Sequence, residues 1–545
     1  MLRDLRSRIP GAALVLWACV FCLSVVLPSS WTGLFASPDE TAVAVSVQRI
    51  EVSGSAGISE PLARALPWLH PRSYLASGDG LVPVGFLGWP WWLAQLARGI
   101  SLNVLAVVAS LVAASGVIPW YLILRRRFGA TAAWWGTALA WSFPAVLLYV
   151  NRSFFSHMPQ LTAGFWALWV LVRAGDSLSS QENHGVKKIF TQVLSGFLFG
   201  VAVSFRPIEL FWMLPVFLLI WTHLVPRIAW KKHGFMGVGM LLGLLPLCVV
   251  QAQTYGSWFQ VGYWVAANSD PAAVIIPQLV AQQAKPWFMA IAPYGLHPRT
   301  VLWNVRWFFL SFLLPWVFVG GLVTLALVIR QARTIRTALP AWIRAHFLTM
   351  SVLGFFIGWI LLIYGSGFYL DHVRPGSVTV GNSFLRYTLP FGFAFAWFMA
   401  WLATKLSLAP KPLRVAYGLA SFILIVCGLY GAFIRDEEGI LATRGELVRY
   451  KTIREAAAKT FIASDIILSE RSDKIFFPVV RAVSPLPSEQ QLQALAAQST
   501  TTAVGLFARP LSLRERDAWR RMGYDVSELG IFGRERLYRL TPFLR

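Results

Sequence analysis

Long apolar runs, separated by short loops, occupy most of the chain. A membrane-spanning helix needs about 20 mostly apolar residues. We therefore predict eleven spans, at 11–28, 101–123, 130–150, 159–174, 189–205, 208–225, 235–253, 303–329, 347–366, 386–404 and 415–434. A further apolar segment, 81–98, carries Trp89, Trp91 and Trp92. Tryptophan suits the headgroup region, so this segment is predicted as a helix lying at the outer interface.

Lysine and arginine mark one side of the predicted membrane. They collect at the N-terminus and in the loops after every second span, for example in 125–127, 330–344 and 405–414. This bias is typical of cytoplasmic loops. The sequence therefore predicts a multi-pass protein of the plasma (inner) membrane with a cytoplasmic N-terminus. A long first loop, 29–100, and the C-terminus would then lie outside the cytoplasm.

The C-terminal segment has a different pattern. The last 111 residues hold 14 of the 25 acidic side chains, and the first 434 residues hold 11. Helical and strand-like patterns alternate in this segment, which predicts a small α/β domain. The expected fold is thus mainly α: a polytopic membrane helix bundle at 1–434, followed by a small extracytoplasmic domain at 435–545. The elements predicted in that domain are helices at 444–463, 489–498 and 512–522 and strands at 466–468, 502–507 and 536–540.

Composition excludes several classes of protein. Hydrophobic residues make up 56% of the chain and charged residues 13%, whereas soluble chains are about 25% charged. A disordered chain and an ordinary soluble enzyme are excluded. The net charge of +23 comes from loops that mark the cytoplasmic side, so no nucleic-acid partner is expected. The four cysteines lie in apolar runs, without the spacing of a zinc site.

Two adjacent carboxylates, Asp39 and Glu40, follow the first span after Ser37-Pro38. Pro38 and Asp39 are typical of a helix start. Carboxylates close to a membrane are costly unless they are paired or solvated. They are either a capping pair in a wet loop or functional, as a general base or a metal ligand. Asp371-His372, in a later external loop, could contribute to a metal site with Asp39.

Three arginines are predicted close to the outer membrane face: Arg152, Arg206 and Arg386. One arginine at that depth can reach lipid phosphates. Three on the face that carries a carboxylate pair favour a phosphate-bearing ligand, because guanidinium binds phosphate through two parallel hydrogen bonds and keeps its charge. Tyr387 adjoins Arg386, and His157 lies in the short loop 151–159. His157 is either a structural residue or a ligand-binding one.

Four sequence elements occur in the order known from one enzyme group. On them, the chain resembles the polytopic glycosyltransferases of the GT-C fold, in particular bacterial relatives of protein O-mannosyltransferases and of lipid A aminoarabinose transferases. The resemblance covers about residues 11–405. The elements are Ser37-Pro38-Asp39-Glu40, the segments 125–129 and 151–159, the Tyr-Gly-Ser-x-x-x-x-Gly-Tyr stretch at 255–263, and Arg386-Tyr387-Thr388-Leu389-Pro390.

The resemblance implies a function and roles for these residues. It implies a polyprenyl-phosphate sugar as donor, a hexosyl or pentosyl group transferred, and a hydroxyl of a glycan, lipid or protein as acceptor. A phosphate leaving group needs no acid, whereas the attacking hydroxyl needs a base, so transfer with inversion is expected. Asp39 would be the base, and Glu40 a supporting group or metal ligand. Arg206, Arg386 and Arg152 would hold the phosphate, together with His157 and Tyr387.

Two departures from the group bear on metal and phosphate binding. Many relatives have an acidic residue where this chain has Ser156-His157, and a Lys-Pro-Pro motif where it has 77–85 without lysine. No cofactor is firmly implied, and a divalent metal ion remains an open expectation. Two alternative functions remain open, an oligosaccharide ligase or polymerase and a lipid-linked glycan transporter. The short loop at 367–385 disfavours the first, and the scarcity of charge within the spans disfavours the second.

Overall fold

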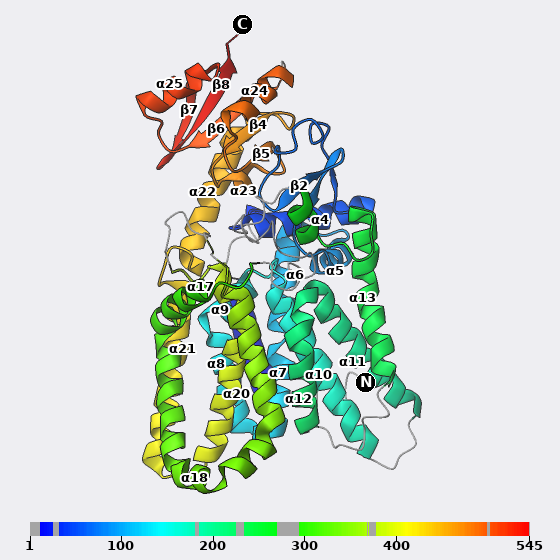
Figure 1. Ribbon diagram of the computed structural model, residues 1–545, viewed down its shortest axis with the longest axis vertical. Helices are drawn as coiled ribbons and strands as arrows, with labels where there is room; N and C mark the ends of the chain where they lie inside the picture. Colours follow the sequence, from blue (N-terminus) through cyan, green and yellow to red (C-terminus); the bar gives the residue numbers. More distant parts are fainter. Residues whose placement is uncertain are drawn as a thin grey trace. The chain divides into compact units, whose positions relative to one another are not determined.

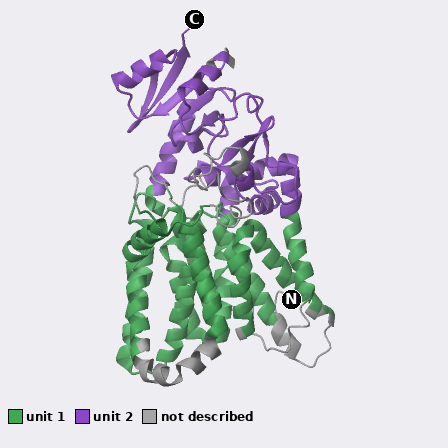
Figure 2. Ribbon diagram, in the orientation of Figure 1, with its two compact units in different colours: residues 1–26, 108–246, 270–442 green, residues 27–107, 247–269, 443–545 purple. Residues whose placement is uncertain are grey.

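The computed structural model describes residues 11–25, 32–179, 185–224, 234–269, 294–367, 369, 378–498 and 502–543. Asp371 and His372 lie outside these ranges. The chain forms two compact units, coloured separately in Figure 2. The first unit takes residues 1–26, 108–246 and 270–442, and the second takes 27–107, 247–269 and 443–545.

The first unit is a bundle of apolar helices (Figure 1). Its α-helices are α2 (Gly11–Ser24), α7 (Val117–Phe128), α8 (Ala130–Ser142), α9 (Pro144–Asn151), α10 (His157–Ser179), α11 (Gly185–Phe205), α12 (Leu210–Leu224), α13 (Gly234–Tyr255), α17 (Pro298–Asn304), α18 (Leu314–Gly358), α19 (Ser383–Tyr387), α20 (Leu389–Leu406) and α21 (Lys411–Phe433). Helix α6 (Leu102–Ala114) begins in the second unit and continues into α7, and the last turns of α13 also belong to the second unit.

The helices of the bundle suit a membrane. Among the described residues, five helices are long and apolar enough to cross one, and counting each of three bent pairs as one span gives up to eight. Large apolar side chains are exposed on them, for instance Leu241 at 71% and Phe318 at 60%. An apolar surface of this kind favours contact with lipid. The predicted polytopic helix bundle is confirmed, and the number eleven stays a prediction.

Three pairs of helices in the bundle are sharply bent. The pair α8 and α9 is bent by 67°, the pair on either side of Arg206 by 120°, and the pair on either side of Leu313 by 89°. The last bend interrupts the segment 303–329, which the sequence predicts as one span. It follows a π-helical stretch, Val305–Phe312. Proline begins α9 and lies at the second position of α18, and a missing proline N–H favours such a break.

Glycines bring α11 and α13 into close contact. A Cβ atom on Gly200 would lie 2.2 Å from the Met240 carbonyl oxygen, and one on Gly239 would lie 2.0 Å from the Val193 carbonyl oxygen. Gly196 and Gly243 make the same kind of contact. Small residues four apart let membrane helices pack backbone to backbone. The glycine spacing therefore allows α11 and α13 to pack closely together. Helix α11 ends at Phe205, directly before the break at Arg206.

The second unit is a mixed α/β assembly. Its first part holds α4 (Pro38–Ser53), α5 (Gly88–Ala97) and a small antiparallel sheet of order β1-β3-β2: β1 (Ile58–Ser59), β2 (Tyr74–Ser77) and β3 (Gly80–Pro83). Its C-terminal part has a five-stranded sheet of order β5-β4-β6-β8-β7. The elements of that part are α22 (Ile440–Ala458), β4 (Ile466–Ser469), α23 (Asp473–Phe476), β5 (Arg481–Val483), α24 (Glu489–Gln498), β6 (Val504–Ala508), α25 (Leu513–Arg521), β7 (Tyr524–Phe532) and β8 (Glu535–Pro542).

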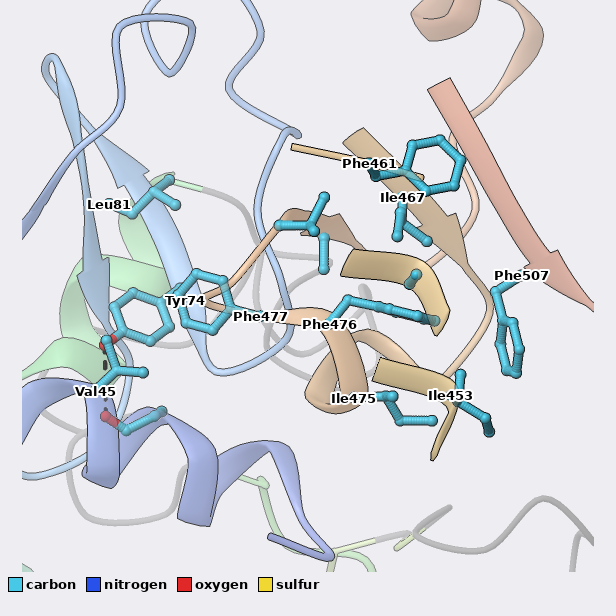
Figure 3. Close-up of a cluster of buried hydrophobic side chains, with 14 of the residues drawn as sticks. Val45, Tyr74, Leu81, Ile453, Phe461, Ile467, Ile475, Phe476, Phe477 and Phe507 are labelled. Atoms are coloured by element: carbon cyan, nitrogen blue, oxygen red, sulfur yellow. Dashed lines mark hydrogen bonds between the residues drawn. The ribbon is translucent and has the colours of Figure 1, made fainter. Parts of the chain in front are cut away.

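The predicted α/β fold of the C-terminal segment is confirmed, but this segment shares its core with the first loop. Val45, Tyr74 and Leu81 are buried in one cluster with residues of the C-terminal sheet and helices, among them Ile467 and Phe476 (Figure 3). Burial raises the pKa of the Tyr74 phenol well above its usual range, so this side chain stays neutral. The compact units therefore divide the chain differently from the predicted boundary between 434 and 435, because the loop and the tail complete one core.

The segment 81–98 also differs from the prediction. Its first residues belong to β3, and α5 begins only at Gly88. The Trp89 side chain is 2% exposed, and α5 packs against α4. Trp89 is therefore a core residue of the second unit.

Candidate functional site

Three breaks between helices supply the polar residues of the first unit. Arg152 and His157 flank the short turn between α9 and α10, Arg206 lies between α11 and α12, and Arg386 and Tyr387 end the short helix α19. Arg152, Arg206 and Arg386 are 7%, 6% and 6% exposed. An arginine reaching for lipid headgroups would expose its guanidinium on the surface. Burial of all three therefore disfavours the lipid-anchor interpretation.

The ring of Tyr387 lies at the centre of this cluster. The guanidinium carbons of Arg206 and Arg386 lie 5.3 Å and 5.4 Å from its centroid. The centroid of the His157 ring lies 5.4 Å away, and the Tyr364 ring stacks on Tyr387 with centroids 4.2 Å apart and an interplanar angle of 8°. Aromatic rings attract cations through their negative faces. Tyr387 thus holds two guanidinium groups and an imidazole around one ring.

Phe155 links Arg152 to the same cluster. The guanidinium of Arg386 lies 4.2 Å from the Phe155 centroid, and that of Arg152 lies 5.0 Å from it. The structure therefore brings together the five residues that the sequence predicts for substrate binding in this unit: Arg152, His157, Arg206, Arg386 and Tyr387. Their roles stay predictions.

Glu209 fixes the orientation of Arg206. The Arg206 Nε donates to Glu209 Oε1 at 3.1 Å, and both side chains are buried. The same carboxylate accepts from the Tyr364 hydroxyl at 2.6 Å and from the Trp212 indole. Three hydrogen bonds from three side chains hold this carboxylate in one orientation. Through its hydrogen bond to Arg206, Glu209 therefore fixes the orientation of the guanidinium group.

Arg386 is positioned by a loop that is itself held at several points. Asn382 caps α19 by accepting from the Phe384 N–H at 2.9 Å, and Ser383 accepts from Arg386 at 3.0 Å. Upstream of this cap, Asp436 accepts from the Val380 N–H at 2.9 Å. Burial raises the pKa of Asp436 above its ordinary value, against backbone hydrogen bonds that lower it. These hydrogen bonds hold the short helix α19, and with it the buried guanidinium of Arg386, in a defined position.

His157 has an unusual environment in this cluster. Its side chain is 6% exposed, and neither ring nitrogen has a hydrogen-bond partner among the described residues. A buried imidazole without partners is costly. His157 lines a small pocket together with Gln160, Glu209, Arg386 and Tyr387. A ligand oxygen in this pocket would satisfy the histidine and lie beside guanidinium.

The two predicted carboxylates lie in the second unit. Helix α4 begins at Pro38, as the sequence predicts, and Ser37 caps it by accepting from the Asp39 N–H at 3.2 Å. Glu40 is 3% exposed, which makes it a buried residue, whereas Asp39 is partly exposed. The Ser73 hydroxyl donates to Asp39 Oδ1 at 2.6 Å. Of the pair, Asp39 is therefore the more exposed carboxylate.

The predicted site thus occurs as two assemblies, a cationic cluster in the first unit and a carboxylate in the second. Within the described ranges, no three His, Cys, Asp or Glu side chains lie together in a way that could hold a metal ion. Asp371 and His372 lie outside those ranges. Metal dependence stays a prediction.

Sequence reasoning did not assign a role to Glu209, Tyr364 or Trp212. The signal for Glu209 is its spacing, since Arg206-Pro207-Ile208-Glu209 places a carboxylate three residues after an arginine across a proline turn. Tyr364 lies within an apolar run, where a tyrosine resembles any other core aromatic residue. Its hydrogen bond to Glu209 joins residues 155 positions apart, and no local pattern reports such a contact.

Comparison with known proteins identifies similar folds only among solved structures. No family model and no curated protein sequence matches the chain. The structure is similar to that of ArnT from Cupriavidus metallidurans, with 13% identity and a TM-score of 0.47 over 96% of this chain and 97% of that one. It is also similar to ArnT bound to undecaprenyl phosphate, with 14% identity and a TM-score of 0.44 over the same shares of the two chains.

A second group of similar structures comes from an archaeon. The oligosaccharyltransferase from Archaeoglobus fulgidus matches with 13% identity and a TM-score of 0.45, over 91% of this chain and 69% of that one. ArnT is a lipid A aminoarabinose transferase, and both enzymes have the GT-C fold. The sequence resemblance names the same group. At these identities and scores, a function has to be argued from the residues of this chain.

Proposed function

We propose that this protein is a membrane glycosyltransferase that moves a sugar from a polyprenyl phosphate to a hydroxyl group of a glycan, lipid or protein. The observation that carries the proposal is the cluster of buried Arg206, Arg386 and Tyr387 beside a buried histidine whose ring nitrogens have no hydrogen-bond partner among the described residues. Cations held around a pocket by rings and a carboxylate favour an anionic ligand. They occur at breaks in apolar helices, which suits an anion carried by a lipid.

The chemistry follows from the leaving group. When the bond between the anomeric carbon and the phosphate oxygen breaks, the polyprenyl phosphate leaves as a monoester anion, and fixed guanidinium groups stabilise its developing charge. In the proposed mechanism, Arg206 and Arg386 bind the phosphate, with Arg152 and His157 beside them. The acceptor hydroxyl loses its proton as its oxygen attacks the anomeric carbon, and we assign that proton to Asp39. Attack opposite the leaving group inverts the configuration at that carbon.

A ligand-binding measurement tests the cluster without requiring the acceptor. We expect purified protein in detergent to be stabilised against heat by undecaprenyl monophosphate, since a ligand that binds only the folded state raises its unfolding temperature. Undecaprenol has the same chain without the charge and is the matched control. Equal stabilisation by the two lipids would show that the hydrocarbon chain alone is recognised, and would remove the basis of the proposal.

We further propose that the N-terminus is cytoplasmic and that the second unit lies outside the cytoplasm. The proposal is supported by the basic loops on one side of the predicted spans. A reporter fused after Arg545 should show extracytoplasmic activity. Cytoplasmic activity of that fusion would contradict this orientation.

A further inference from the structure

We infer that the C-terminal part of the second unit positions Asp39, through Asp473 acting on Arg72 and Ser73. This inference rests on the proposed function, because it assigns a purpose to the C-terminal domain in presenting the candidate base. Asp39, Arg72, Ser73 and Asp473 all lie in the second unit.

Ser73 contacts the candidate base directly and has an unusual backbone. Its hydroxyl donates to Asp39 Oδ1 at 2.6 Å. Its φ angle is +65°, and among the described residues it is the only one other than glycine with a positive φ. Residues with a side chain adopt this region at a cost, and such strain persists only where the surroundings enforce it. The surroundings therefore keep the Ser73 hydroxyl on Asp39 against the preference of the backbone.

The preceding residue, Arg72, supplies that enforcement through the C-terminal part. The Arg72 backbone N–H donates to Asp473 Oδ2 at 2.8 Å, and its Nε and Nη2 donate to Asp473 Oδ1 at 2.8 Å and 2.6 Å. Asp473 is 1% exposed. A carboxylate that binds both the backbone and the side chain of one residue fixes its conformation. The turn that carries Ser73 is thus fastened to α23.

Two further contacts join the same region to α23 and to Phe477, the residue that follows it. The Lys474 ammonium donates to the Ala36 carbonyl oxygen, next to the residue that caps the helix of Asp39. Tyr74, which follows Ser73, packs on Phe477 with ring centroids 5.2 Å apart (Figure 3). The segment before Asp39 and the turn that contacts its side chain are therefore both held by residues 473–477. These are positioning residues, since none of them needs to touch the substrate.

The chain offers a close control for the Arg72–Asp473 pair. Arg481 Nε donates to Glu60 Oε2 at 2.9 Å, with side-chain exposures of 24% and 8%, compared with 26% and 1% for Arg72 and Asp473. Glu60 also accepts from a backbone N–H, that of Leu62, at 3.2 Å. Both pairs join the first loop to the C-terminal part. Only one of them adjoins the residue that holds Asp39.

The experiment compares Asp473→Ala with Glu60→Ala in the full-length protein. We expect both variants to lose similar thermal stability, and only Asp473→Ala to lower kcat, by about tenfold at nearly constant donor KM. Amide hydrogen exchange in a peptide covering residues 34–42 should quicken in Asp473→Ala and stay unchanged in Glu60→Ala. Equal losses of kcat in the two variants, or equal exchange, would overturn the inference.

Variants of Ser73 test the last contact. Ser73→Gly removes the hydroxyl and relaxes the backbone, so a stabilised protein with kcat lowered about tenfold is expected. Ser73→Asn tolerates the same φ angle and offers an N–H donor, so it should recover part of the activity. In the Asp39→Asn background, Ser73→Gly should cost nothing further. A full additional loss there would show that Ser73 acts elsewhere.

These readouts separate the two proposals. If the wild-type protein transfers no sugar, the proposed function fails, and the exchange measurement still decides whether the C-terminal part holds the segment of Asp39. If the wild type is active and Ser73→Gly is unaffected, the inference fails and the proposed function stands.

Discussion

The Asp39→Asn variant should fold and insert into the membrane normally and transfer sugar about a hundredfold or more slowly, which is the usual scale for the loss of a general base. Asparagine keeps the shape of the side chain and can still accept the hydrogen bond from Ser73. It cannot accept a proton. Since a phosphate leaves without an acid, removing the acceptor proton is the one proton transfer that the protein must supply.

Two comparisons make this prediction specific. Asp79 lies in the same loop and pairs with Arg64, with 68% of its side chain exposed, so Asp79→Asn should keep activity within about twofold. Glu40→Gln should be milder than Asp39→Asn if Glu40 only supports the helix start, and equally severe if it binds a metal. Sensitivity to a chelator distinguishes these cases. Nearly wild-type transfer by Asp39→Asn would require a base at Asp79, His157 or Asp371.

The Arg386→Ala and Arg206→Ala variants should each lower donor turnover by about ten- to a hundredfold, because a hydrogen bond to a charged group contributes about 1.5–3 kcal/mol. Lysine at either position should recover only part of the activity, since it lacks the planar fork. Stabilisation by undecaprenyl monophosphate should fall in parallel.

The first unit supplies a matched control for Arg386. The Arg435 guanidinium lies 4.2 Å from the Phe312 centroid, the same distance as that of Arg386 from Phe155. Arg435→Ala should therefore remove a similar ring contact without affecting donor use. The Arg206→Ala variant leaves the buried Glu209 carboxylate without its partner guanidinium. A double variant, Arg206→Gln with Glu209→Gln, therefore serves as a second test, because it removes both charges of the pair. Normal donor use by Arg386→Ala and by this double variant would reduce the cluster to a structural one.

Much of the fold follows from local patterns in the sequence. Apolar length predicts the helices of the bundle, and Pro38 and Asp39 predict the start of α4. Two strands of the C-terminal sheet were missed for different reasons. β5 has only three residues, and β7 lies at the sheet edge with few buried side chains, so it lacks a clear alternation. The shared core of loop and tail depends on contacts between residues about 400 positions apart, which no local pattern reports.

The candidate site was predictable to a similar extent. Residue type and predicted depth were enough to select Arg206 and Arg386, because charge near a membrane span needs a reason. Their supporting residues were not predictable, since Tyr364 and Asp436 become significant only once helix breaks bring them to Glu209 and Val380. The same holds for Ser73 and Asp473, which are 400 residues apart in the chain and joined through Arg72.

One measurement tests the central claim most directly. Purified protein in detergent is given a polyprenyl-phosphate sugar labelled in the sugar, together with envelope glycolipid as acceptor, and the lipid product is identified. The account predicts free polyprenyl monophosphate in amounts equal to the glycosylated acceptor, from the wild type and not from Asp39→Asn. Passage of intact labelled donor across a vesicle membrane without bond cleavage, or release of a polyprenyl diphosphate from a diphosphate-linked donor alone, would contradict it.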